Sequence, residues 1–130
     1  MGVRVFTDVH ITVSGDKDNN KEWKKGEPMT VIEKKLDSCT VSVYPPLNPD
    51  HETLTLPDNM MAQFGIIAKV SRDGVVVSGA DMIYNYEQVL RQIQYTNKKP
   101  AYYLNRVFKL ICSELNGRFT SNEYVQTVSF

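Results

Sequence analysis

The sequence predicts an all-β protein, an antiparallel Greek-key β-sandwich with one short crossing helix. Roughly seven or eight short segments of alternating apolar and polar residues follow one another about ten residues apart, a spacing typical of β-sandwiches. A single stretch near residue 86 changes to helical spacing. The chain has 130 residues, 42% of them hydrophobic and 23% charged, which suits one globular domain with its own core. We therefore expect residues 1–130 to form a single β-sandwich domain.

The first third of the chain combines two predicted strands with a long polar loop. A half-buried first strand is predicted because five apolar residues share one parity. They are Val3, Val5, Val9, Ile11 and Val13. Residues 14–28 are polar and predict a loop. Residues 36–44 alternate again with Cys39 on their apolar face, and Pro45 ends this strand because proline lacks the N–H that a ladder needs.

The middle of the chain predicts a hairpin followed by the crossing helix. Strands at 66–70 and 75–78 flank an Asp-Gly pair at 73–74, and both residue types tolerate the positive φ of a tight turn. Apolar residues then recur at helical spacing. They are Tyr86, Val89, Leu90 and Ile93. Asn85, with Gln88 three residues later, resembles a capping box and would begin this helix.

Three further strands complete the predicted sandwich. Residues 53–56 form a short one, and residues 107–112 alternate with Cys112 on the apolar face. An Asn-Gly turn at 116–117 then leads into a last strand at 119–130.

Charge and motif content exclude several function classes. The 15 basic side chains balance the 15 acidic ones, so the chain lacks the basic excess of a nucleic-acid-binding protein. No stretch is long and apolar enough to insert into a membrane. Neither a nucleophile elbow nor a phosphate-binding or dinucleotide-binding loop occurs, and His10 and His51 are too far apart for a zinc motif. We expect a noncatalytic protein with no cofactor, no nucleic-acid partner and no direct membrane insertion.

The two cysteines, Cys39 and Cys112, permit one disulfide. Each lies on the apolar face of its own predicted strand, so both side chains should point into the sandwich. Their separation of 73 residues resembles that of a bridge between the two sheets, joining an early strand to a late one. The alternative is two buried free thiols, because cysteine also packs as a small apolar residue. The matched parity favours the disulfide, which would place the domain in an oxidising compartment.

The polar loop contains a weak calcium candidate. Asp16, Asp18 and Asn20 bring together the carboxylate and amide oxygens that calcium prefers. The EF-hand pattern fails, because the loop lacks the glycine at the sixth position and the glutamate at the twelfth. The favoured interpretation is a solvated connecting loop, and no metal site is expected.

Three aromatic residues in predicted loops are candidates for protein contact. Trp23 is the single large apolar residue of the polar loop, and Tyr102 and Tyr103 follow Lys98 and Lys99. Tyrosine suits protein recognition because it offers a large contact area at a small entropic cost. The alternative is that these rings pack on the rim of the sandwich.

Five segments of the chain carry a resemblance to a known family. The segments read LDSC at 36–39, LNPDHE at 47–52, NYEQVL at 85–90, FKLICSELNGR at 108–118 and SNE at 121–123. Together they resemble the membrane-proximal ectodomain region of the calsyntenins, also called alcadeins. The resemblance covers residues 36–130, and residues 1–35 carry no motif that places them.

The resemblance implies an extracellular sandwich of the cadherin or immunoglobulin kind within a type I transmembrane protein of the cadherin superfamily. That protein would pass through the endoplasmic reticulum and Golgi to the postsynaptic membrane and act in synaptic adhesion. A neurexin ectodomain and the other domains of the same ectodomain are the implied partners. Calcium is implied for the cadherin repeats of the full-length family and not for these residues. The alternative is a membrane-proximal spacer that positions the outer domains and binds no partner itself.

Overall fold

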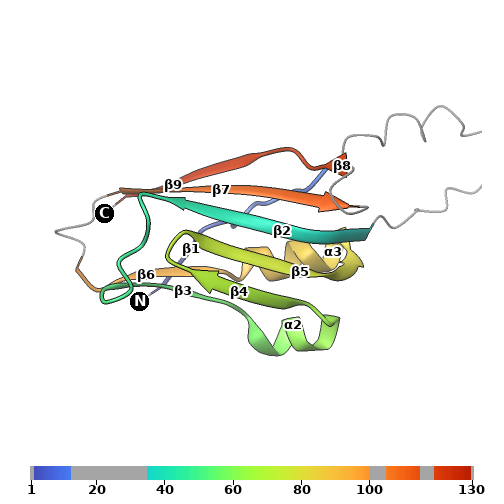
Figure 1. Cartoon of the computed structure of the whole chain (residues 1–130), viewed down its shortest axis with the longest axis horizontal. Coiled ribbons are helices and arrows are strands. Elements are labelled where there is room, and N and C mark those ends of the chain that lie inside the picture. Colours follow the sequence, from blue (N-terminus) through green and yellow to red (C-terminus); the bar gives the residue numbers. More distant parts are fainter. Residues whose placement is uncertain (1, 13–34, 100–104, 115–118, 130) are drawn as a thin grey trace, which may run out of the picture.

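Two antiparallel sheets make up the fold (Figure 1). The computed structural model describes residues 2–12, 35–99, 105–114 and 119–129. The smaller sheet has the strand order β1-β6-β3, and the larger one has the order β4-β5-β2-β7-β8, with β9 also paired to β7. Their elements, in chain order, are β1 (Val3–Arg4), β2 (Lys35–Tyr44), β3 (Glu52–Thr55), α2 (Asp58–Phe64), β4 (Ile67–Ser71), β5 (Gly74–Met82), α3 (Ile83–Arg91), β6 (Gln94–Asn97), β7 (Asn105–Glu114), β8 (Phe119–Thr120) and β9 (Tyr124–Ser129).

The predicted all-β antiparallel sandwich is confirmed, including its connections between the sheets. The chain passes from β3 in the smaller sheet through α2 to β4 in the larger one. It returns from β5 through α3 to β6, so α3 is the predicted crossing helix. The chain therefore crosses between the sheets several times, and β2 pairs with β5 and with β7 although both are distant from it in the chain.

The core lies between the sheets and is built by the alternating faces of β2 and β7. Val41 and Val43 of β2 and Phe108 and Leu110 of β7 are all buried. The alternation in β2 shifts near its start, because the register with β5 has an irregularity between Leu36 and Ser38. This irregularity turns Leu36 inward although its parity differs from that of the other buried residues, as a bulge does.

The predicted hairpin is confirmed as the β4–β5 connection, but its turn lies one residue earlier than the Asp-Gly pair, and Gly74 already belongs to β5. Ser71 pairs with Gly74, and Arg72 and Asp73 form the two-residue turn. Gly74 has a φ of 138°, and a Cβ built there would lie 1.8 Å from the carbonyl oxygen of Val41. Only glycine fits at this position, because β2 passes too close for any side chain.

The predicted helical face of α3 is confirmed, but its predicted start is wrong. Tyr86, Val89, Leu90 and Ile93 have no exposed surface. The helix begins at Ile83 after an extended Met82, and no side chain caps it. The amide of Asn85 instead donates to Asp81, so the proposed capping box does not form.

A second short helix, α2, was not predicted. It is bounded by Pro57 and by Gly65, which adopts the left-handed conformation with a φ of 69°. These are recognised signals at helix ends. The helix buries Met61 as its one fully buried residue, so its periodicity is too weak to reveal it.

The first predicted strand is mostly wrong. Strand β1 comprises Val3–Arg4 alone, and a turn at residues 7–8 interrupts the extended chain. The turn allows neighbouring Val5 and Phe6 to be buried together, which a regular strand does not permit. Val9 and Ile11 are buried as predicted, while Val3 is exposed and Val13 lies outside the described residues.

Candidate recognition surface

The predicted disulfide between Cys39 and Cys112 is present. Both cysteines are buried, as the parity of their strands predicts. They lie directly opposite each other on β2 and β7, with a Cα–Cα distance of 3.9 Å. The expectation of a bridge between the two sheets is therefore wrong, because these strands are neighbours in one sheet. The disulfide fixes the two central strands of the larger sheet to each other.

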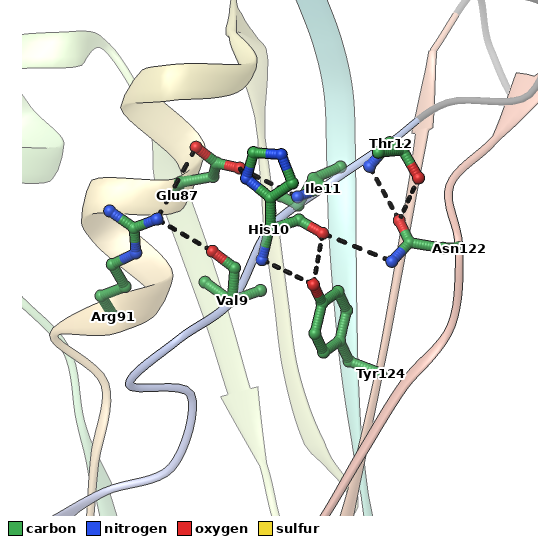
Figure 2. A network of polar contacts seen from close by, with 8 residues as sticks. All are labelled: Val9, His10, Ile11, Thr12, Glu87, Arg91, Asn122 and Tyr124. Carbon is green, nitrogen blue, oxygen red and sulfur yellow. Dashed lines mark hydrogen bonds and ion pairs between the residues drawn. The ribbon is translucent and has the colours of Figure 1, made fainter.

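A polar network holds the N-terminal segment, residues 5–12, across one side of the sandwich (Figure 2). The backbone N–H of Val5 donates to the carbonyl of Ile93, beside the smaller sheet. The buried carboxylate of Glu87 on α3 accepts from the N–H of Ile11 at 2.9 Å and lies 3.3 Å from Nδ1 of His10. Figure 2 shows how α3 thereby holds this segment from one flank.

The other flank of the same segment is held by the larger sheet. The N–H of Thr12 donates to Oδ1 of Asn122 at 2.8 Å, and the N–H of Asn122 donates to the carbonyl of Thr12 at 3.0 Å. The N–H of His10 donates to the Tyr124 hydroxyl at 2.8 Å. These contacts join positions more than 100 residues apart in the chain, so the N-terminal segment closes the side of the sandwich between the β1 and the β8–β9 margins.

A buried ion pair joins the two sheets inside the sandwich. Arg106 of β7 donates to Oε1 of Glu52 on β3 at 2.8 Å, and the hydroxyl of Tyr95 on β6 donates to Oε2 of the same carboxylate. The N–H of Asn48 also donates to Oε1 at 2.9 Å. The loop around His51 also bonds to itself, because the backbone N–H groups of His51 and Glu52 both donate to the carbonyl of Asn48.

The environment of Glu52 favours its charged form. Burial by itself would raise the pKa of this carboxyl group. The hydrogen bonds from Tyr95, from the backbone of Asn48 and from Arg106, together with the Arg106 charge, outweigh burial and lower the pKa below its usual value. Burial and the Glu52 carboxylate raise the pKa of Tyr95, which stays neutral and donates its proton to the hydrogen bond. No local sequence pattern reveals this pair, because Arg106 lies 54 positions from Glu52.

Exposed apolar side chains gather on the outer face of the larger sheet, the face turned away from the smaller sheet. The register aligns Lys69, Val76, Thr40 and Ile111 in one row across β4, β5, β2 and β7. Further exposed apolar residues on this face are Ile67, Tyr44 and Val125. A shallow hollow of about 550 Å³ lies beside Tyr44 and is also lined by Ser42, Val107 and Lys109.

A groove opens between the margins of the two sheets on the side opposite the N-terminal segment. It has a volume of about 370 Å³ and lies between β3 and β4. Its apolar lining comes from Leu47, Leu54 and Val70, and Glu52 also contributes to the lining. Arg72 provides the cationic part of the lining.

The other residues singled out from the sequence lie outside the described part of the chain. These are the contact candidates Trp23, Tyr102 and Tyr103 and the calcium candidates Asp16, Asp18 and Asn20. Within residues 2–12, 35–99, 105–114 and 119–129, no three His, Cys, Asp or Glu side chains come together as a metal site. None of the helices in these ranges is long and apolar enough to cross a membrane.

Comparisons with known proteins extend the match to nearly the whole chain. The family model described as "Calsyntenin C-terminal" matches residues 2–130, so residues 2–35 are included. Calsyntenin-1 of Drosophila melanogaster is 46% identical over 96 residues, which cover 72% of this chain and 10% of the relative. Calsyntenin-2 of Danio rerio is 36% identical over 126 residues, with coverages of 95% and 13%.

Human calsyntenin-1 is 36% identical over 132 residues, which cover 95% of this chain and 14% of the relative. The chain thus spans between 10% and 14% of the length of these curated relatives. No solved structure matches the chain significantly. The chain belongs to the calsyntenin family, and it corresponds to the C-terminal region that the family model describes.

Proposed function

We propose that the chain is a noncatalytic extracellular module of a calsyntenin-like transmembrane protein and acts in cell adhesion through protein–protein recognition. Family membership and the small share of the relatives that the chain spans support a module within a longer protein. The disulfide between Cys39 and Cys112 supports an extracellular setting, because disulfides persist in oxidising compartments.

The outer face of the larger sheet carries this proposal. Its central row places Val76, Thr40 and Ile111 side by side, with Tyr44 exposed over 73% of its surface on the same face. Contiguous exposed apolar surface favours a protein contact, and aromatic side chains contribute most strongly to such contacts. Lysines 69 and 109 border the row and add a positive rim.

The proposed partner is a neurexin ectodomain, and the proposed location is the outer side of the postsynaptic membrane. The protein would reach it through the endoplasmic reticulum and Golgi. The proposed contact needs no cofactor in this module, and any calcium dependence would come from the cadherin repeats of the same protein. Other domains of that ectodomain would contact the module in cis.

Binding of the 130-residue chain to a purified neurexin ectodomain, with and without calcium, tests the proposal. The complete ectodomain of a calsyntenin relative is measured beside it. We expect saturable binding by the chain itself, and at least a tenfold loss of affinity in Val76→Glu and Ile111→Glu, because a charge would be desolvated at the contact. Tyr84→Glu is the matched control, since Tyr84 is exposed on α3 and lies off the outer face.

The other possible outcomes show whether the contact surface, the role of the module or the partner is wrong. Loss of binding in Trp23→Ala, Tyr102→Ala or Tyr103→Ala, with Val76→Glu unaffected, would move the contact to the loops. Binding by the complete ectodomain alone would overturn recognition by this module. If neither the 130-residue chain nor the complete ectodomain binds neurexin, the proposed partner is wrong.

The second candidate function is a structural spacer, and the N-terminal segment favours it. Thr12 bonds to Asn122 and Glu87 bonds to Ile11, so direct hydrogen bonds tie the N-terminal segment to α3 and to the region before β9. Such a module would hold outer domains at a set position above the membrane. Surface-wide substitution without any effect on partner binding would support this function over recognition.

A further inference from the structure

The two sides of the sandwich, where the edges of the two sheets face each other, differ in structure. On one side, residues 5–12 bridge the β1 margin and the β8–β9 margin with backbone and side-chain hydrogen bonds. On the other side, β3 and β4 border the groove, and among the described residues no strand pairs with the outer edge of β4. The fold thus contains one margin bridged by an extended segment and a second margin at which the edge of β4 has no paired strand among the described residues.

Strand β4 is a free edge of the larger sheet, as Figure 1 shows. All five of its residues are exposed, and β5 is the one strand with which it pairs among the described residues. Ser71 and Gly74 flank the two-residue turn, so they form a hydrogen-bonded pair, and the pairs alternate from there. The backbone N–H and C=O groups of Ala68 and Val70 therefore point away from β5 and are available to another strand.

The side chains of β4 divide between two surroundings. Val70 is exposed over 50% of its surface and lines the groove together with Leu47 and Leu54. Lys69 has the opposite parity and belongs to the row on the outer face. A strand added to β4 would point alternate side chains into the groove and onto the outer face.

The charges near β4 favour one kind of segment as its pairing partner. Lys69 and Arg72 are positive, and the carboxylate of Glu52 in the groove lining is already bonded to Arg106. A second copy of β4 is disfavoured, because the register that pairs all five residues places Lys69 opposite Lys69. An acidic residue opposite Lys69 would be stabilised in the same position.

We propose that β4 accepts an extended segment of a partner protein by strand addition, with apolar side chains entering the groove and acidic side chains facing Lys69. The inference deepens the proposed function, since it rests on the module's recognising a protein. Main-chain hydrogen bonds to Ala68 and Val70 supply affinity, and the groove and Lys69 supply specificity. The preferred segment alternates apolar and acidic residues and has no proline at its centre.

Selection from a displayed library of random twelve-residue peptides against the 130-residue chain tests this inference. We expect enriched peptides with the alternating apolar and acidic pattern, and slower hydrogen exchange at the amides of Ala68 and Val70 when such a peptide is bound. Ala68→Pro removes one outward N–H without touching the groove lining, and edge strands tolerate proline. It should weaken binding at least tenfold, with its folding checked by circular dichroism.

Lys69→Glu keeps the test decisive if Ala68→Pro fails to fold. It should redirect selection from acidic to basic peptides, whereas Lys35→Glu should leave selection unchanged, because Lys35 is exposed on β2 and β5 separates that strand from β4. Absence of enriched peptides overturns the inference. So does equal binding to wild type and Ala68→Pro, or self-association that Lys69→Glu alters, which would make a second copy the occupant.

The neurexin measurement separates the two proposals. If neurexin binds and neither Ala68→Pro nor Lys69→Glu changes its affinity, recognition stands and strand addition at β4 is overturned. If the selected peptides slow hydrogen exchange in β4 and neurexin does not bind, strand addition at β4 is supported and the proposed partner is wrong.

Discussion

At the scale of single residues, Glu52 shows how the interior accommodates a charge. Its carboxylate receives hydrogen bonds from Arg106, Tyr95 and the backbone of Asn48, so both of its oxygens are used. A buried pair of this kind contributes little net stability compared with an apolar pair, yet removal of one partner is costly. The cost arises because the remaining charge stays buried without compensation.

We predict that Glu52→Gln lowers the free energy of unfolding by about 3 kcal/mol at neutral pH, because Arg106 loses its partner charge. The pKa of Glu52 is lower in the folded protein than its ordinary value of 4.5. Its stabilisation is therefore present above that value and is lost as the pH falls through the folded pKa. Urea denaturation across this acidic range should show a shallower pH dependence in Glu52→Gln than in wild type.

Asp50→Asn is the control for this prediction, because Asp50 is exposed in the same loop. It should match wild type at neutral pH to within about 0.5 kcal/mol. An unchanged pH dependence in Glu52→Gln would contradict the assigned role of the carboxylate.

At the scale of elements, the central strands β2 and β7 are joined twice, by their ladder and by the disulfide. We predict that replacing both Cys39 and Cys112 by alanine lowers the free energy of unfolding by at most about 4 kcal/mol, because a 73-residue loop is no longer closed in the unfolded chain. Equilibrium urea denaturation measures the change. Reduction of the native protein should add about 2 Da, and an unchanged mass would contradict the disulfide.

The two helices differ in which of their features can be recognised from the sequence. The face of α3 is evident from the sequence, because three of its apolar residues and Ile93, just beyond its end, recur at helical spacing and all are buried. Its start is not evident, because it follows directly from the end of β5 rather than from a capping residue. Helix α2 has the opposite character, with clear signals at Pro57 and Gly65 but too little periodicity between them.

At the scale of the whole molecule, the N-terminal segment joins both sheets through α3 and the region before β9. We predict that Glu87→Ala leaves the N–H of Ile11 without its acceptor and lowers the free energy of unfolding by about 1–3 kcal/mol. Hydrogen exchange at Ile11 should accelerate more than exchange in β2 or β7. Glu123→Ala is the control, because its pair with Lys109 is long at 3.8 Å and solvent-exposed, and such pairs contribute little.

The same scale explains why parts of the fold were predictable and others were not. Alternation in β2 and β7 reports the buried side of each strand, so the inward direction of Cys39 and Cys112 follows from local pattern. Alternation does not report which strand is the neighbour. The disulfide was therefore expected between the sheets, although β2 and β7 pair within one of them.

Local patterns in the sequence are sufficient to predict the all-β class, the β4–β5 hairpin, the apolar face of α3 and, through its motifs, the calsyntenin family. Each of these depends on residues close together in the chain, whose backbone preferences and periodicity act locally. The path of residues 5–12, the contact of Glu52 with Arg106 and the position of β4 at the edge of the larger sheet among the described residues are visible only in the folded molecule. These depend on contacts between distant segments, which form only when the packing of two sheets brings the segments together.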